Sequence, residues 1–150
     1  MKKIIIYGGK KLHGSISVSG SKNSSLAILA SSMLFEKKVV LKNIPVVEDI
    51  KTMIKLLIYL GKNIKVKKKT IEITNSKKFG KSFIAPYELV KTMRAGILVL
   101  GPLISKFKKA KVSLPGGCAI GARPIDLHLK FLKSIGVRNH IDKGLSLIHI

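Results

Sequence analysis

Alternating apolar and polar positions open the chain. Ile4–Tyr7 is a short apolar run closed by Gly8 and Gly9, and Leu12–Val18 alternates with period two. These patterns predict two strands. The segment LAILASSML then changes the pattern, and Ser21 precedes it at the position of a helix N-cap. The first part of the chain therefore predicts two strands and then a helix that starts beside Ser21.

Strands and helices alternate through the next segments. Glu48 and Asp49 open an apolar pattern of helical spacing, and acidic residues in a first turn suit the helix dipole. Gly61 follows this pattern as a C-terminal cap. The expected elements are a strand at 39–44 ended by Pro45, this helix, and a strand pair at 64–66 and 71–73 joined by a turn at 67–69.

The second half repeats this order. Pro86 can start a helix from Tyr87 to about Ile104, which Pro102 would bend or end. A strand at 111–114, a helix at 124–135 capped by Gly136 and a strand at 137–141 follow. The segments LLIYLGKNIKV and FLKSIGVRNHI share an apolar helix end, a glycine and an alternating strand, which indicates an internal repeat. The alternation favours an α/β fold. The last strand, in GLSLIHI, has no evident partner.

The net charge of +22 raises the question of nucleic-acid binding. Of the 29 basic residues, 26 are lysines scattered along the chain and only 3 are arginines, whereas base and phosphate recognition favours arginine. Lysine on tolerant surface positions under A/T-biased mutation explains the charge. No apolar run has membrane-span length, no signal peptide is evident, and one cysteine cannot form an internal disulfide. These features favour a cytoplasmic protein.

Three segments hold the candidate chemistry. In LPGGCAIGARPIDLH, Cys118 follows a Gly-rich turn beside Arg123 and the predicted start of a helix, where positive potential favours a thiolate and Asp126 opposes it. In GSKNSS, Lys22 and Asn23 lie at a helix N-terminus, a place that suits anions. A buried small thiol and a solvated lysine are the ordinary alternatives.

The third segment is APYELVKTMRAG, in which Arg94 stands inside an otherwise apolar helical pattern. Such an arginine pairs with an acid, extends its head to water, or meets an anionic ligand. No phosphate-loop motif and no metal-ligand spacing of histidines occurs in the sequence.

Together the three segments resemble the UDP-N-acetylglucosamine 1-carboxyvinyltransferase family of enolpyruvyl transferases, from Ile4 to about Ile141. The resemblance implies a lobe of repeated β/α units with inward helices, the inside-out α/β barrel fold. It implies transfer of the enolpyruvyl group of phosphoenolpyruvate to the 3-hydroxyl of UDP-N-acetylglucosamine in peptidoglycan precursor synthesis, without a metal or cofactor.

The resemblance also implies site roles. Lys22 and Arg123 would contact phosphoenolpyruvate, and Arg123 the nucleotide sugar as well. Asn23 and Arg94 would contact UDP-N-acetylglucosamine. Cys118 would sit on a mobile loop as the proton donor to C3, and would be alkylated by fosfomycin. The uridine pocket would be lined by Pro124, Ile125, Asp126 and Leu127.

The same resemblance predicts the organisation of the chain as roughly the first third of such an enzyme. Residues 1–20 would be strands that belong to the second lobe, 21–143 an incomplete first lobe, and 144–150 an atypical tail. The family's aspartate base and further arginines come later, so this stretch alone would be inactive.

Three other functional interpretations remain open. The related 3-phosphoshikimate 1-carboxyvinyltransferase shares the chemistry but lacks the PGGC loop and the RPxDLH run. A basic RNA-binding module would explain the charge, although stacking aromatic residues are few. A remnant of a decaying gene would explain the A/T bias, but Lys22, Arg94, Cys118 and Arg123 are all intact.

Overall fold

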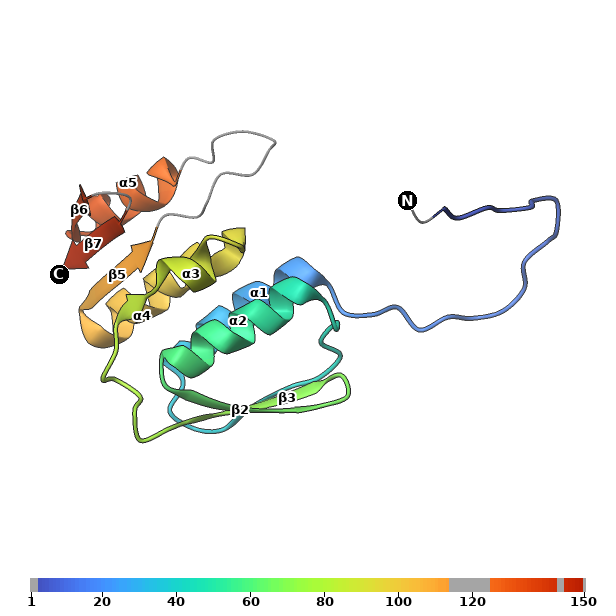
Figure 1. Ribbon diagram of the computed structural model, residues 1–150, viewed down its shortest axis with the longest axis horizontal. Helices are drawn as coiled ribbons and strands as arrows, with labels where there is room; N and C mark the ends of the chain where they lie inside the picture. The colour runs from blue at the N-terminus through green and yellow to red at the C-terminus, as the bar shows by residue number, and fades with distance from the viewer. Residues whose placement is uncertain (1–2, 114–124, 143–144, 150) are drawn as a thin grey trace.

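The computed structural model describes residues 3–113, 125–142 and 145–149 (Figure 1). Its helices, with η marking 3-10 turns, are α1 (Lys22–Ser31), η1 (Ser32–Leu34), α2 (Glu48–Tyr59), α3 (Tyr87–Val90), η2 (Arg94–Val99), α4 (Leu100–Phe107) and α5 (Asp126–Ser134). Its strands are β1 (Val39–Leu41), β2 (Lys62–Lys67), β3 (Thr70–Asn75), β4 (Ile84–Ala85), β5 (Lys109–Ser113), β6 (Arg138–Asp142) and β7 (Leu145–His149).

The two sheets share a three-strand arrangement. The first has the order β1-β3-β2, and the second has the order β4-β5-β7-β6, in which β4 is an additional strand parallel to β5 at the edge. In both, a strand leads to a helix (α2 or α5) and then to an antiparallel hairpin whose second strand lies in the middle. Gly61 and Gly136, both with positive φ, end the two helices at matching positions. The predicted repeat and the α/β class are confirmed.

Helices α1, α2, α3 and α4 lie between the two sheets, whereas α5 lies at the outer end of the molecule beside β6 (Figure 1). Helix α1 packs against α2 and η2, while α4 packs against β5 and η1. The centre is filled by side chains with no solvent exposure, among them Leu29, Met33, Met53, Leu57 and Leu103. On β3, Ile71 and Ile73 alternate with polar residues and face this core, which is why a period-two pattern predicted the strand.

The predicted strands at 4–7 and 12–18 are absent from the structure, so this prediction was wrong. Residues 3–21 have no regular secondary structure, and their large apolar side chains are exposed, with Leu12 at 95% and Ile4 at 90%. An alternating pattern makes a strand only where another strand accepts its backbone hydrogen bonds, and none of the described strands pairs with this segment. The assignment of residues 1–20 to a second lobe stays a prediction.

The single helix expected from Tyr87 to about Ile104 is also corrected. Pro86 does begin it, but the chain forms α3, η2 and α4 in succession because Met93 adopts an extended conformation and enters the core. Pro102 does not end the last helix. It is the third residue of α4, where the missing N–H needs no partner.

The strand near the C-terminus has partners after all. β7 lies between β5 and β6 and pairs antiparallel with both. Its pairing with β5 joins segments more than thirty residues apart, which a local pattern does not reveal.

Candidate functional site

The start of α1 is held by two local features. The Ser21 hydroxyl accepts a hydrogen bond from the Ser24 N–H at 3.4 Å, so Ser21 is the N-cap that the sequence predicted. Gly20 lies so close to the connection between β1 and α2 that a Cβ there would be 1.9 Å from the Asn43 carbonyl oxygen. Glycine at this position therefore allows the first turn of α1 to lie beside the segment that leads into α2.

Lys22 forms an ion pair across this junction. Its Nζ lies 2.8 Å from Oδ2 of Asp49, which is the second residue of α2. The side chains are 49% and 37% exposed, so the pair contributes less than about 1 kcal/mol to stability. Lys22 carries a positive charge at the positive end of its own helix, and the Asp49 carboxylate offsets that repulsion.

Asn23 and Arg94 present exposed side chains from neighbouring elements. Asn23 is the second residue of α1, and η2, which packs against α1, begins at Arg94. Arg94 is therefore not inside a helix, as the sequence suggested, but at the start of a 3-10 turn, because Met93 is extended. Its guanidinium has no ion pair or hydrogen bond to another described residue, which leaves its donors available to a ligand.

The remaining predicted site residues lie in or beside the segment 114–124. Cys118, Arg123 and Pro124 lie outside the described residues. Ile125 is buried in the core, whereas Asp126 and Leu127 are exposed in the first turn of α5.

The N-terminal ends of α1, α2 and α5 face the same side of the molecule (Figure 1). Parallel helix dipoles place partial positive charge at that side, and together with Lys22 and Arg94 they favour an anionic ligand.

An apolar groove opens beside the start of α2. It has a volume of about 370 Å³ between α2, the β2–β3 hairpin and the segment that precedes α2. It gathers none of the predicted site residues, and its charged groups are lysines at the rim. Within the described ranges, no cluster of three or more His, Cys, Asp or Glu side chains could hold a metal ion, and no helix there has the length and apolarity to cross a membrane.

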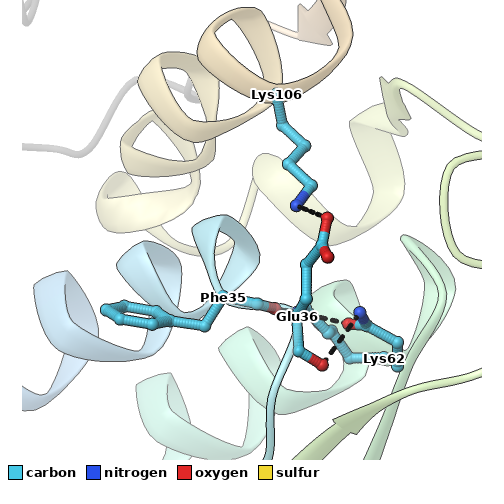
Figure 2. A network of polar contacts seen from close by, with 5 residues as sticks. Phe35, Glu36, Lys62 and Lys106 are labelled. Carbon is cyan, nitrogen blue, oxygen red and sulfur yellow. Dashed lines mark hydrogen bonds and ion pairs between the residues drawn. The ribbon is translucent and has the colours of Figure 1, made fainter.

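Lys62, which no sequence pattern marks as a site residue, is only 2% exposed. Its Nζ donates to the Phe35 carbonyl oxygen at 3.0 Å and to Asn75 Oδ1 at 2.6 Å (Figure 2). The ammonium also lies 4.2 Å from the centre of the Phe79 ring. Burial, and to a lesser extent the charge of Lys106, lowers the pKa of Lys62 to about 8.

The ammonium of Lys62 already contacts acceptors and a ring of the protein itself. We therefore interpret Lys62 as a structural residue that connects the end of η1, the first sheet and the loop after β3. Above it, Lys106 of α4 pairs with Glu36 at 2.8 Å (Figure 2). Among 26 lysines, the sequence offers no signal that singles out Lys62.

Residues 6–150 match the family described as EPSP synthase (3-phosphoshikimate 1-carboxyvinyltransferase). The chain belongs to this family. The sequence-based prediction that the chain belongs to the enolpyruvyl transferase family is therefore confirmed.

Curated relatives carry a more specific name. The chain is 58% identical over 144 residues to UDP-N-acetylglucosamine 1-carboxyvinyltransferase of Pelagibacter ubique, and 54% identical over 144 residues to that of Lawsonia intracellularis. Each alignment covers 96% of this chain and 34% of the relative. The chain thus spans about a third of the length of the curated relatives it matches.

Two solved structures share the fold. The enolpyruvyl transferase NikO from Streptomyces tendae matches with a TM-score of 0.75 at 19% identity, over 95% of this chain and 31% of that protein. EPSP synthase from Acinetobacter baumannii matches with a TM-score of 0.64 at 16% identity, over 89% of this chain and 31% of that protein. At these identities the likeness establishes the fold alone.

Proposed function

We propose that this chain is part of an enzyme that transfers the enolpyruvyl group of phosphoenolpyruvate to the 3-hydroxyl of UDP-N-acetylglucosamine and releases phosphate. The observation that carries the proposal is the 58% identity, over 96% of the chain, to a relative named for that reaction. The enzyme would act in the cytoplasm in peptidoglycan precursor synthesis, and so in cell shape and division, without a nucleic-acid or membrane partner.

The reaction is an addition followed by an elimination. The 3-hydroxyl loses its proton to the general base, the aspartate expected later in the chain, as its oxygen bonds to C2 of phosphoenolpyruvate and C3 gains a proton from the general acid, which gives a tetrahedral phospho-ketal. The C2–O bond to phosphate then breaks and C3 loses a proton, which leaves the enolpyruvyl ether and inorganic phosphate. Both substrates are anionic, so fixed cations would stabilise the charge that develops on the leaving phosphate.

The residues of this chain would divide that work. Lys22, at the start of α1, would bind phosphoenolpyruvate together with Arg123. Asn23 and Arg94 would bind the nucleotide sugar, and residues 124–127 would hold its uridine. Cys118 would give the proton to C3. The exposed guanidinium of Arg94, which has no ion pair with another described residue, and the helix ends that share one side support this division.

The choice of acceptor tests the proposal. A chain of the relatives' full length, with residues 1–150 as its first third, is incubated with phosphoenolpyruvate and either UDP-N-acetylglucosamine or shikimate 3-phosphate. We expect phosphate release with the nucleotide sugar alone. Release with shikimate 3-phosphate alone would assign the related activity. No release, with salt-sensitive binding at specific RNA sites instead, would favour an RNA-binding module.

Labelling by fosfomycin tests the role of Cys118. In the same full-length protein, Cys118→Asp should keep measurable turnover, because a carboxylic acid can also donate a proton. It should lose covalent labelling, since a carboxylate is a poor nucleophile toward the epoxide compared with a thiolate. Mass spectrometry of the peptide that contains residue 118 measures the labelling. Labelling of the variant elsewhere in the chain would contradict the assignment.

A further inference from the structure

Lys22 has a partner that its proposed role does not require. Its Nζ donates to Asp49 Oδ2 at 2.8 Å, and the two residues are 27 positions apart in the sequence. An ammonium group has three N–H donors. The contact with Asp49 occupies one of them, and the half-exposed side chain leaves the other two accessible to a ligand.

Asp49 is the more firmly placed member of the pair. It lies in the first turn of α2, where the Val47 carbonyl accepts from the N–H groups of Ile50 at 3.1 Å and Lys51 at 3.2 Å. The positive end of α2 also holds the carboxylate charge there. The ammonium of Lys22 lies at the end of a flexible four-carbon side chain. A hydrogen-bond acceptor in a fixed position, such as Asp49, therefore determines where the ammonium lies.

The neighbouring carboxylate shows that this contact is particular to Asp49. Glu48 precedes it in the same turn, yet it pairs with Lys51 of its own helix at 3.0 Å. Of the two acidic residues that open α2, Asp49 is the one that reaches α1. The close approach of Gly20 to Asn43 fixes the distance between the starts of α1 and α2, which the Asp49 side chain spans.

From this geometry we propose that Asp49 is a positioning residue that holds the Lys22 ammonium at the start of α1, with its two remaining N–H groups directed to the phosphoenolpyruvate anion. The inference rests on the proposed function, which assigns phosphoenolpyruvate to Lys22. Asp49 does not touch the substrate; it acts through Lys22.

A double-mutant cycle in the full-length protein tests this inference. Asp49→Ala should lower kcat/KM for phosphoenolpyruvate about tenfold, mainly through KM, because the ammonium is no longer held in place. The KM for UDP-N-acetylglucosamine should stay within about twofold of the unmodified enzyme. In the Lys22→Ala background, Asp49→Ala should add no further loss, since residues that act through one contact are not additive. Glu48→Ala is the matched control and should leave kcat/KM within about twofold.

A second readout does not depend on turnover. Acetylation of the Lys22 amine, followed by mass spectrometry of its peptide, should be faster in Asp49→Ala than in the unmodified protein, and unchanged in Glu48→Ala. Asp49→Asn keeps a hydrogen-bond acceptor on a side chain of the same length but removes the charge. Acetylation of Lys22 in this variant should therefore be faster than in the unmodified protein and slower than in Asp49→Ala. Equal rates in all of these proteins would overturn the inference, whatever reaction the enzyme catalyses.

The outcomes separate the inference from the function. If Lys22→Ala lowers kcat/KM but Asp49→Ala matches Glu48→Ala, Asp49 has no positioning role and the proposed function stands. If Lys22→Ala leaves phosphoenolpyruvate use unchanged, the assignment of that substrate to Lys22 fails, and the inference fails with it.

Discussion

Lys22 and Lys62 have the same side chain and opposite surroundings. Lys22 is half exposed, and among the described residues its ammonium pairs with the Asp49 carboxylate alone. Lys62 is buried, with two oxygen acceptors and an aromatic ring around its ammonium. Burial penalises the charge of Lys62 and thereby lowers its pKa, whereas the exposed amine is suited to meeting a ligand. The environment, and not the residue type, decides which lysine is structural.

The lowered pKa of Lys62 predicts how stability depends on pH. Its pKa is about 8 in the folded protein and 10.5 ordinarily, so between these values the unfolded chain binds more protons. The free energy of unfolding should therefore rise with pH across this window, by at most about 3 kcal/mol. Lys62→Met should abolish this rise. Urea unfolding of both proteins from pH 7 to 10.5 measures it, and parallel curves would contradict the prediction.

At the scale of elements, the site depends on how two helix starts are brought together. Ser21 fixes where α1 begins, and Glu48 and Asp49 fix where α2 begins; both signals are local and visible in the sequence. The distance between the two starts is set by the contact of Gly20 with Asn43. Because α1 and α2 pack along their lengths, a shift of one start would move Lys22 away from Asp49.

Gly20→Ala tests this contact. The new Cβ would meet a backbone oxygen that cannot move aside alone, so the free energy of unfolding should fall by about 1–3 kcal/mol. Gly101→Ala is the matched control, because a Cβ there meets nothing within 4 Å in α4. It should leave stability unchanged or raise it by up to about 1 kcal/mol. Equal effects of the two substitutions in urea unfolding would refute a special role for Gly20.

At the scale of the whole molecule, the two repeats differ in what covers their helices. Leu56 of α2 and Phe131 of α5 occupy matching positions before the helix-ending glycines. Leu56 has no exposed surface because α1 and α3 pack against α2, whereas Phe131 is 63% exposed. Leu127 and Ile135, one turn away on either side, are exposed as well, at 79% and 59%. The same helical pattern thus gives a core position in one repeat and a surface position in the other.

Alanine at these matching positions should have very different costs. Leu56→Ala leaves a cavity in the core and should lower the free energy of unfolding by about 2–5 kcal/mol. Phe131→Ala removes a side chain that is already mostly in water and should change it by only about 0.5 kcal/mol. Urea unfolding of the 150-residue chain measures both values. A large loss in Phe131→Ala would show that α5 is covered in solution.

Features that depend on near neighbours could be predicted from the amino-acid order: the caps, the hairpin with its turn at 67–69, the helix–glycine–strand repeat, and the placement of Lys22 and Asn23 at a helix start. Periodicity and capping act within a few residues, so a linear pattern contains them. Tertiary structure alone decided that residues 4–18 form no strand, that the helix after Pro86 breaks at Met93, and that β7 is a central strand. It also decided that Asp49 faces Lys22 and that Lys62 is buried. Each of these depends on a partner far along the chain, because strand pairing, burial and ion pairing are set by neighbours in space.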